Sequence, residues 1–143
     1  MKNKLIYKYI GKVLIAFAVL MMLPMIVAII YKESVIPFFI PAIISLGIGA
    51  LLNSIKLNNK TLYAKDGFII VALAWIIISI IGALPLWISN SSSLIDALFE
   101  AVSGLTTTGA TIFKDVKVLD KSILFWRSFM HFIGGMGVLA FVM

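Results

Sequence analysis

The chain has 143 residues, of which 62% are hydrophobic and 13% are charged, and its mean hydropathy is +1.14. An ordinary soluble domain is about 45–50% apolar and about 25% charged, and a domain of this length could not bury so much apolar surface. These values exclude a soluble enzyme, a disordered tail and, with no cysteine present, a disulfide-stapled secreted domain. The composition therefore predicts a protein of the lipid bilayer.

The net charge is +6, from 12 Lys and Arg against 6 Asp and Glu. In a soluble protein such an excess would favour nucleic acid as a partner. Here the lysines lie between long apolar runs, where lysines set the orientation of helices and meet anionic lipid headgroups. We therefore expect contact with membrane lipid and no binding of nucleic acid.

Four apolar segments are long enough to cross a bilayer, which takes roughly 20 helical residues. They are residues 13–31, 35–52, 67–88 and 123–143. The first segment is longer than the apolar region of a signal peptide, which has about 7–15 residues, and no small-residue cleavage site follows it. The sequence thus predicts an all-α membrane protein whose first two helices form a hairpin within residues 1–62.

The lysines predict the orientation of these helices. Seven of them lie in the N-terminal tail and in the 53–66 loop: Lys2, Lys4, Lys8, Lys12, Lys56, Lys60 and Lys65. Because basic residues favour the cytoplasmic side, we expect the N-terminus and this loop in the cytoplasm. Residues 89–122 then lie outside, although three lysines also occur there. The last helix has barely crossed at Met143, so we expect the natural chain to continue beyond it.

The external stretch predicts a short helix followed by extended backbone. Residues 94–105 (LIDALFEAVSGL) read as a helix that Ser91, Ser92 or Ser93 can cap and whose first turn contains Asp96. At 1.5 Å per residue this helix is about 18 Å long, too short to span a bilayer. The following residues 106–111 (TTTGAT) favour an extended strand with exposed carbonyl oxygens.

A half-helix and an extended segment between two spanning helices are the layout of a re-entrant pore loop. Irregular backbone is tolerated at membrane depth only where it is buried in protein or lines water. Carbonyl oxygens that line such a path can replace the hydration shell of a cation. The partly negative C-terminus of the half-helix would point toward the ion path.

Three motifs in this region resemble a known family. Residues 98–111 read LFEAVSGLTTTGAT, residues 125–128 read FWRS, and residues 134–137 read GGMG. In this order they resemble the first pore repeat of the Trk/Ktr/HKT potassium transporters, and most closely bacterial TrkH-type subunits, which place a two-helix hairpin ahead of it. The resemblance implies a potassium-channel-like fold of four helix–pore-loop–helix repeats around one pore. Residues 63–143 would be the first repeat, truncated at its last helix.

The resemblance also implies a site and an activity. Aligning the filter glycine with that of potassium channels implies potassium coordination by the carbonyl oxygens of Thr107, Thr108, Gly109 and Ala110. The filter is less regular than the channel signature Val-Gly-Tyr-Gly, so strict exclusion of sodium does not follow. The implied function is potassium uptake across a bacterial inner membrane, without covalent chemistry or a bound cofactor. The implied partners are a second full-length subunit, in a homodimer, and a cytosolic nucleotide-binding regulatory subunit of the Trk A type.

Two polar residues in the fourth apolar segment need an explanation. Arg127 lies about five residues into this helix, where it either snorkels to the outer interface or forms an ion pair with Asp96 or Glu100 of the half-helix. The sequence does not choose between these alternatives. His131 follows one turn later, and we expect a packed, hydrogen-bonded side chain in preference to a proton relay. Without a second histidine or a cysteine nearby, a site for a metal other than potassium is disfavoured.

Three further interpretations concern single motifs. The GGMG sequence favours close helix packing over a gating hinge. Ser103 and His131 faintly resemble the pair of an intramembrane serine protease, which would require them to meet within about 3 Å. This enzyme interpretation is disfavoured because Ala101 stands where such a motif has glycine. A small membrane anchor or assembly protein without transport activity is the remaining alternative, and it leaves the Thr-Gly segment unexplained.

Overall fold

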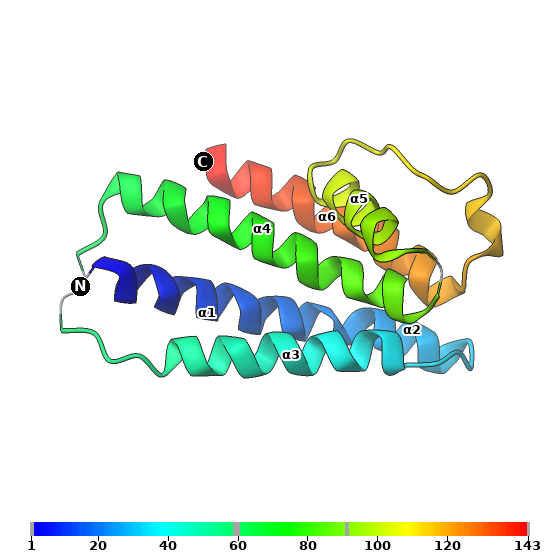
Figure 1. Ribbon diagram of the computed structural model, residues 1–143, viewed down its shortest axis with the longest axis horizontal. Coiled ribbons are helices and arrows are strands. Elements are labelled where there is room, and N and C mark those ends of the chain that lie inside the picture. The colour runs from blue at the N-terminus through cyan, green and yellow to red at the C-terminus, as the bar shows by residue number, and fades with distance from the viewer. Residues whose placement is uncertain (1, 59–60, 91, 143) are drawn as a thin grey trace.

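The computed structural model describes residues 2–58, 61–90 and 92–142, and every regular element among them is helical. The elements are α1 (Lys2–Leu20), α2 (Met22–Ile30), α3 (Ile36–Asn53), α4 (Ala64–Ile88), α5 (Leu94–Leu105), the 3-10 turn η1 (Val116–Val118) and α6 (Lys121–Val142). The long helices run along the long axis of the molecule, and α1 begins toward the same end at which α6 finishes (Figure 1). The predicted all-α fold is confirmed for the described residues.

The first helix starts earlier than the apolar run predicts. The lysine-containing tail is helical from Lys2 onward, and Lys8 Nζ donates to the carbonyl oxygen of Ile55 at 3.3 Å, beyond the end of α3. α1 ends at Leu20 because Pro24 has no N–H to donate to the Leu20 carbonyl. α2 continues directly from this break.

Three helical stretches of the described residues are long and apolar enough to cross a membrane: Asn3–Ile30, Ile36–Asn53 and Ala64–Ile88. α6 has the length expected of a fourth span, but the side chains of residues 138–143 lie outside the described part of the chain, so the fourth span, residues 123–143, stays a prediction. The chain is therefore a multi-pass membrane protein.

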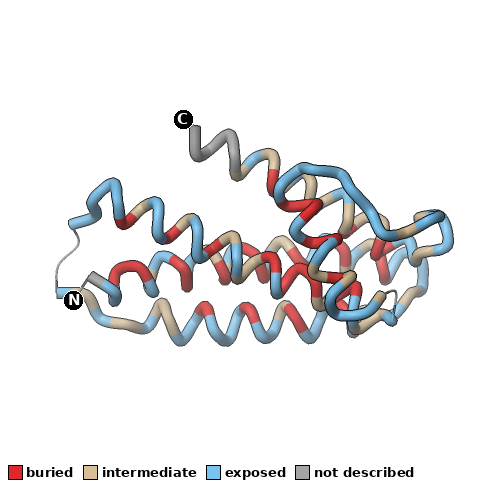
Figure 2. Tube along the Cα trace, turned by 45° about the horizontal axis from the view of Figure 1, so that its top comes forward, coloured by how far each residue is buried: buried red, intermediate tan, exposed pale blue. Residues whose placement is uncertain are grey.

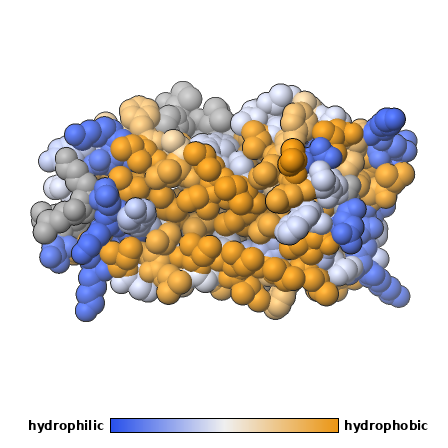
Figure 3. Space-filling view, viewed as in Figure 1, coloured by the Kyte–Doolittle hydropathy of each residue, from blue (hydrophilic) through white to orange (hydrophobic). Residues whose placement is uncertain are grey.

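The surface agrees with a bilayer environment. On the face shown in Figure 3, a broad apolar belt covers the middle of the molecule, and hydrophilic residues collect at its two ends. Large side chains such as Ile29, Leu51 and Ile95 are between 66% and 79% exposed, as is suitable for contact with lipid or with further protein. The start of α1, which contains lysines, and residues 53–58, which contain Lys56, share one end of the molecule (Figure 1). Lys60 and Ser91 lie outside the described residues.

α1 and α3 pack so closely that their backbones touch. A Cβ on Gly11 would lie 2.8 Å from the carbonyl oxygen of Gly49, and a Cβ on Gly49 would lie 2.8 Å from that of Gly11. One turn away, buried Ser45 donates its hydroxyl to the Leu14 carbonyl at 2.7 Å. This contact is built from small residues and contains no charge.

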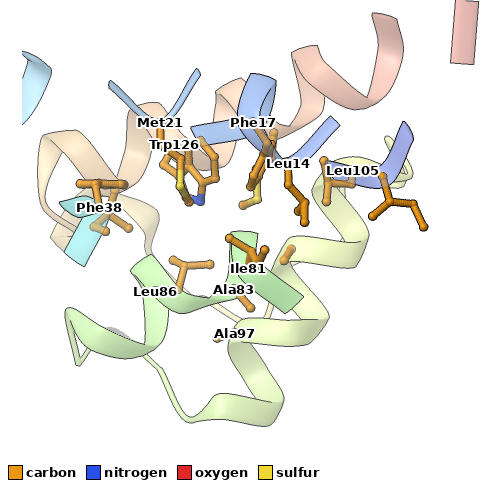
Figure 4. Close-up of a cluster of buried hydrophobic side chains, with 14 of the residues drawn as sticks. Leu14, Phe17, Met21, Phe38, Ile81, Ala83, Leu86, Ala97, Leu105 and Trp126 are labelled. Atoms are coloured by element: carbon orange, nitrogen blue, oxygen red, sulfur yellow. The ribbon is translucent and has the colours of Figure 1, made fainter. Parts of the chain in front are cut away.

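The core lies where α1, α2 and α3 meet α4, α5 and α6, and buried residues concentrate along these contacts (Figure 2). Trp126 of α6 is fully buried, and its ring meets those of Phe17 and Phe38 at centroid distances of 5.6 and 6.1 Å (Figure 4). Its indole N–H donates to the carbonyl oxygen of Gly82 at 2.9 Å. A single side chain of α6 thus connects the N-terminal helices with α4.

Candidate functional site

α5 has the bounds that the sequence predicts. Ser93 is its N-cap, and the Ser93 hydroxyl oxygen accepts from the Asp96 N–H at 3.3 Å. Of the three serines that could have served, the structure therefore selects Ser93. Asp96 lies in the first turn, where a carboxylate complements the partial positive charge of a helix N-terminus.

α5 stops partway along its neighbours, at the level of a glycine of α6. A Cβ on Gly134 would overlap the carbonyl oxygen of Leu105 and lie 2.7 Å from its carbonyl carbon, so the end of α5 rests directly on the α6 backbone. Gly134 follows Lys121 by thirteen residues, or about 20 Å along α6. The chain after α5 then returns to the end of the molecule from which α5 entered (Figure 1).

The predicted extended conformation is wrong for the first two threonines. Thr107 N–H donates to the Gly104 carbonyl at 3.0 Å and Thr108 N–H donates to the Ser103 carbonyl at 2.9 Å, the pair of bonds that defines a Schellman helix end. Thr107 accordingly has a φ of 57°, a left-handed value unusual for a β-branched residue. The carbonyl groups at the end of the helix compete for these N–H donors and curl the chain.

Beyond this turn the chain is stretched, although no strand partner pairs with it among the described residues. A Cβ on Gly135 would lie 3.9 Å from the Thr107 methyl group, whereas the Thr111 side chain shares a partner with Arg127. Thr107 thus lies beside Gly135 and Thr111 near Arg127, and these two α6 residues are eight positions, or about 12 Å, apart along the helix. The chain covers this distance in the four residues from Thr107 to Thr111, which is close to the roughly 3.3 Å per residue of extended backbone.

The carbonyl oxygens of this segment differ in their hydrogen bonds. Among the described residues, no N–H or O–H donates to the carbonyl oxygens of Thr107, Thr108 or Gly109. The Ala110 carbonyl instead accepts from the Ser103 hydroxyl at 2.6 Å. Residues 106–112 are all exposed. The segment therefore presents three consecutive carbonyl groups without a donor, and a fourth that is tied to α5.

Glu100 of α5 holds the far end of this segment. Its side chain is only 2% exposed. Oε1 accepts from the Thr111 hydroxyl at 2.5 Å and from the Ile112 N–H at 2.7 Å, while Oε2 accepts from Arg127 Nε at 3.1 Å. One buried carboxylate thus joins α5, the stretched segment and α6.

The structure pairs Arg127 with Glu100 and not with Asp96. Arg127 has a side chain that is 14% exposed and points inward, with its guanidinium carbon 5.5 Å from the centre of the Phe113 ring. Snorkelling to the outer interface is therefore not its conformation. Among the described residues, the Asp96 carboxylate has no cation within 4 Å.

Ser103 and His131 do not form a catalytic pair. The Ser103 hydroxyl donates to Ala110, and His131 Nδ1 lies 2.8 Å from the Arg127 carbonyl oxygen, to which it must donate its proton. Each polar group is thus bonded to backbone. His131 is packed and hydrogen-bonded, as expected.

The glycines of α6 serve as contact points within an unbroken helix. Gly134 meets Leu105, and a Cβ on Gly137 would lie 3.2 Å from the Trp75 ring. Close packing is therefore the role that the structure supports for GGMG.

Sequence reasoning missed three participants. Ser103 and Thr111 lie within the quoted motif, but nothing in their spacing shows that they bind Ala110 and Glu100. The third, Glu33, lies far away in the chain and accepts hydrogen bonds from the first residues of α6. No group of three or more His, Asp or Glu side chains in the described parts could hold a metal ion.

Comparisons with known proteins place this geometry in context. A family model described as "TrkH: Cation transport protein" matches residues 32–143. The Trk system potassium uptake protein TrkG of Escherichia coli K12 is 46% identical over 127 residues, which are 86% of this chain and 26% of that protein. The Trk system potassium uptake protein TrkH of Halomonas elongata is 34% identical over 142 residues, which are 96% of this chain and 30% of that protein.

A solved structure is similar as well. The crystal structure of the potassium transporter TrkH from Vibrio parahaemolyticus matches with a TM-score of 0.89 at 37% identity, covering 96% of this chain and 30% of that one. The chain thus spans between 26% and 30% of the length of these relatives.

Proposed function

The chain belongs to the TrkH family of cation transport proteins, and from this premise we propose that it forms the first part of a potassium uptake subunit. In this proposal potassium moves through a filter to which Thr107, Thr108 and Gly109 contribute carbonyl oxygens. Ala110 closes the segment, with its carbonyl oxygen shared with Ser103. No covalent chemistry is needed, and the enzyme interpretation is set aside.

One observation carries the proposal: three consecutive carbonyl groups without donors lie beyond a half-helix that ends about 20 Å along α6. A backbone carbonyl at such a depth needs a partner, because the hydrocarbon core offers no water. A partly dehydrated cation is such a partner. The C-terminus of α5 adds its partial negative charge beside the segment.

The segment supplies only one wall of a path. Its residues 106–112 are exposed, so further protein must face them before an ion is enclosed. We propose that residues 1–62 form a transmembrane hairpin and that residues 63–143 form the first of several helix–pore-loop–helix repeats. The remaining repeats would supply the other walls of the filter.

The relatives and the lysines also support a proposal for the cellular setting. We place the subunit in a bacterial inner membrane, with its N-terminus in the cytoplasm. The complete subunit would form a homodimer and bind a cytosolic nucleotide-binding regulator of the Trk A type. Both relatives are potassium uptake proteins, which supports potassium as the transported ion.

Gly109 offers the test. Its φ is 80°, a value that a residue with a Cβ adopts only at a cost, although a Cβ would meet nothing within 4 Å. In the complete subunit, Gly109→Ser should therefore weaken rubidium uptake or its preference over sodium by changing the backbone and not by a clash. Gly67→Ser is the matched control, because a Cβ there also meets open space at an ordinary φ.

Uptake is measured in cells that lack other potassium importers. Reduced rubidium affinity or selectivity in Gly109→Ser, with Gly67→Ser unchanged, would support the proposal. Unchanged uptake in both variants would exclude this segment as the filter. A membrane anchor or assembly role would then be the better explanation.

A further inference from the structure

The connection between α2 and α3 directs a carboxylate toward a distant helix. α2 ends in a Schellman motif, in which the Lys32 N–H donates to Ile29 at 3.2 Å and the Glu33 N–H donates to Ala28 at 2.7 Å. Lys32 has a φ of 56° in this turn. The chain therefore reverses at the end of α2, and Glu33 is the first residue after the reversal.

The Glu33 carboxylate accepts three hydrogen bonds from the first residues of α6. Oε1 accepts from the Lys121 N–H at 2.7 Å, and Oε2 accepts from the Ser122 N–H at 2.9 Å and the Ser122 hydroxyl at 2.6 Å. The first N–H groups of any helix have no partner within it. In α6 the acceptor is Glu33, which lies 88 positions before Lys121 in the chain. This capping role is usually filled by a side chain next to the helix start.

The charge of Glu33 matters for these bonds. Burial raises its pKa, but the hydrogen bonds from Ser122 and from the Lys121 N–H, together with the Lys121 ammonium, outweigh burial and hold the pKa below its ordinary value. The charged residues nearest in the two connected segments are Lys32 beside it, and Asp120 and Lys121 at the start of α6. The carboxylate is therefore ionised at neutral pH and acts as a charged cap.

α6 carries this constraint toward the candidate filter. Arg127, the partner of Glu100, follows Lys121 by six residues, or about 9 Å along the helix. Between them, Trp126 is buried against Phe17 and Phe38 of the same N-terminal helices. The N-terminal helices thus hold α6 at its first turn and again one turn later, immediately beside Arg127.

We propose that Glu33 is a positioning residue for the cation path: it fixes the first turn of α6 and thereby sets Arg127 against Glu100, which anchors the candidate filter segment. This inference rests on the proposed function. It gives the N-terminal hairpin a task in transport, although the hairpin itself contributes no filter residue. The hairpin is a brace for α6.

The pH dependence of this cap has a definite sign. Because the pKa of Glu33 is lowered in the folded state, its contribution to stability is complete above the pKa of an unfolded Glu, about 4.3. The contribution is lost as the pH falls through the lower, folded-state pKa. Removing the charge by mutation should therefore matter at pH 7 and progressively less below about pH 4.3.

The experiment compares Glu33→Gln, Glu33→Asp and Asp115→Asn in the complete subunit. Asp115 is a matched control, because it is an exposed carboxylate in the 106–120 connection that, within the described part of the chain, accepts only from the Lys117 N–H two residues later. Thermal unfolding between pH 7 and pH 3.5 measures the cap. Rubidium KM and preference over sodium measure the filter, and the double variant with Glu100→Gln measures their coupling.

We expect Glu33→Gln to lower Tm at pH 7, with the difference from wild type shrinking below about pH 4.3, and to raise the rubidium KM several-fold. Glu33→Asp should recover part of both losses, and Glu33→Gln should add little to the KM of Glu100→Gln. A lowered Tm with unchanged KM would overturn the positioning role, as would values equal to those of Asp115→Asn. Failure of the proposed function is seen separately, as unchanged uptake in Gly109→Ser.

Discussion

The N-terminal helices α1 to α3, which we propose to form a transmembrane hairpin, and the α5–α6 unit are both helical, but different forces hold them together. α1 and α3 touch through Gly11 and Gly49, and the contact is apolar apart from one serine. α5 and α6 are joined by a buried carboxylate that accepts from two segments at once. The contact between α1 and α3 is stabilised by close packing, whereas the contact between α5 and α6 is stabilised by close packing and by a buried ion pair.

This difference has a physical consequence. Packing through glycine tolerates the loss of a hydrogen bond but not the addition of a methyl group, since interiors leave little free space. A contact through a buried carboxylate is instead sensitive to the loss of its partner, because that loss leaves an uncompensated charge in a medium that solvates it poorly. Substitutions of the two kinds should therefore separate the two regions.

The largest effect should come from Arg127→Gln. Glu100 would keep its bonds from Thr111 and Ile112 but lose its cation, and breaking a buried pair in this way costs about 3–5 kcal/mol. The yield of folded subunit and its Tm measure the loss. Lys117→Gln, at an exposed site, should cost about 0–1 kcal/mol. Equal stability of the two variants would show that charge does not hold this unit.

Gly134→Ala should come next. Its Cβ would overlap the Leu105 carbonyl, a backbone group that cannot rotate away, so α5 and α6 must separate. We expect the upper end of the roughly 1–3 kcal/mol range for overpacking. The neighbouring Gly135→Ala meets only the Thr107 methyl at 3.9 Å and should be tolerated. Size-exclusion profiles of the two variants compare them directly, and identical profiles would argue against this contact.

Gly49→Ala tests the hairpin in the same way. The new Cβ would lie 2.8 Å from both the Gly11 carbonyl oxygen and Ile15 Cγ1, of which the side-chain atom can move. A loss of about 1–2 kcal/mol is expected, within the range for overpacking. Gly47→Ala, on the same helix, meets nothing within 4 Å and should leave Tm unchanged or slightly higher. If Gly47→Ala lowered Tm more than Gly49→Ala, close packing at Gly49 would not be what holds α1 and α3 together.

The smallest effect should be a slight gain in stability, from Lys32→Gly. Lys32 adopts a left-handed φ of 56°, which costs a non-glycine residue roughly 1–2 kcal/mol. Lys32→Gly should relieve part of this cost and raise Tm slightly, offset by the greater freedom of glycine in the unfolded chain. Lys56→Gly lacks the relief and should lower Tm or leave it unchanged. A lower Tm in Lys32→Gly would indicate that the lysine side chain stabilises the turn.

The two regions also differ in how far their sequences predict them. The apolar runs identify the helices of the hairpin, and the serine run 91–93 and Thr106 bound α5, because capping and β-branching act locally; the choice of Ser93 among the serines comes from the structure. Whether Arg127 pairs with Asp96 or with Glu100 depends on how far α5 extends along α6, and no local sequence pattern contains this information. The Thr-Gly run predicts an extended Thr107 because β-branched residues disfavour helix, but the hydrogen bonds at the helix end outweigh this preference and give Thr107 a left-handed φ. Glu33 and Lys121 are too distant in sequence for any periodicity to link them.

The proposed function requires that the donor-free carbonyl groups of Thr107, Thr108 and Gly109 face a cation. Anomalous diffraction from crystals of the complete subunit grown with thallium, which replaces potassium, tests this claim most directly. We predict anomalous peaks within coordination distance of these three carbonyl oxygens, with Glu100 remaining bonded to Thr111 and Ile112. Thallium bound elsewhere along the path, with no peak at these oxygens, would contradict the claim.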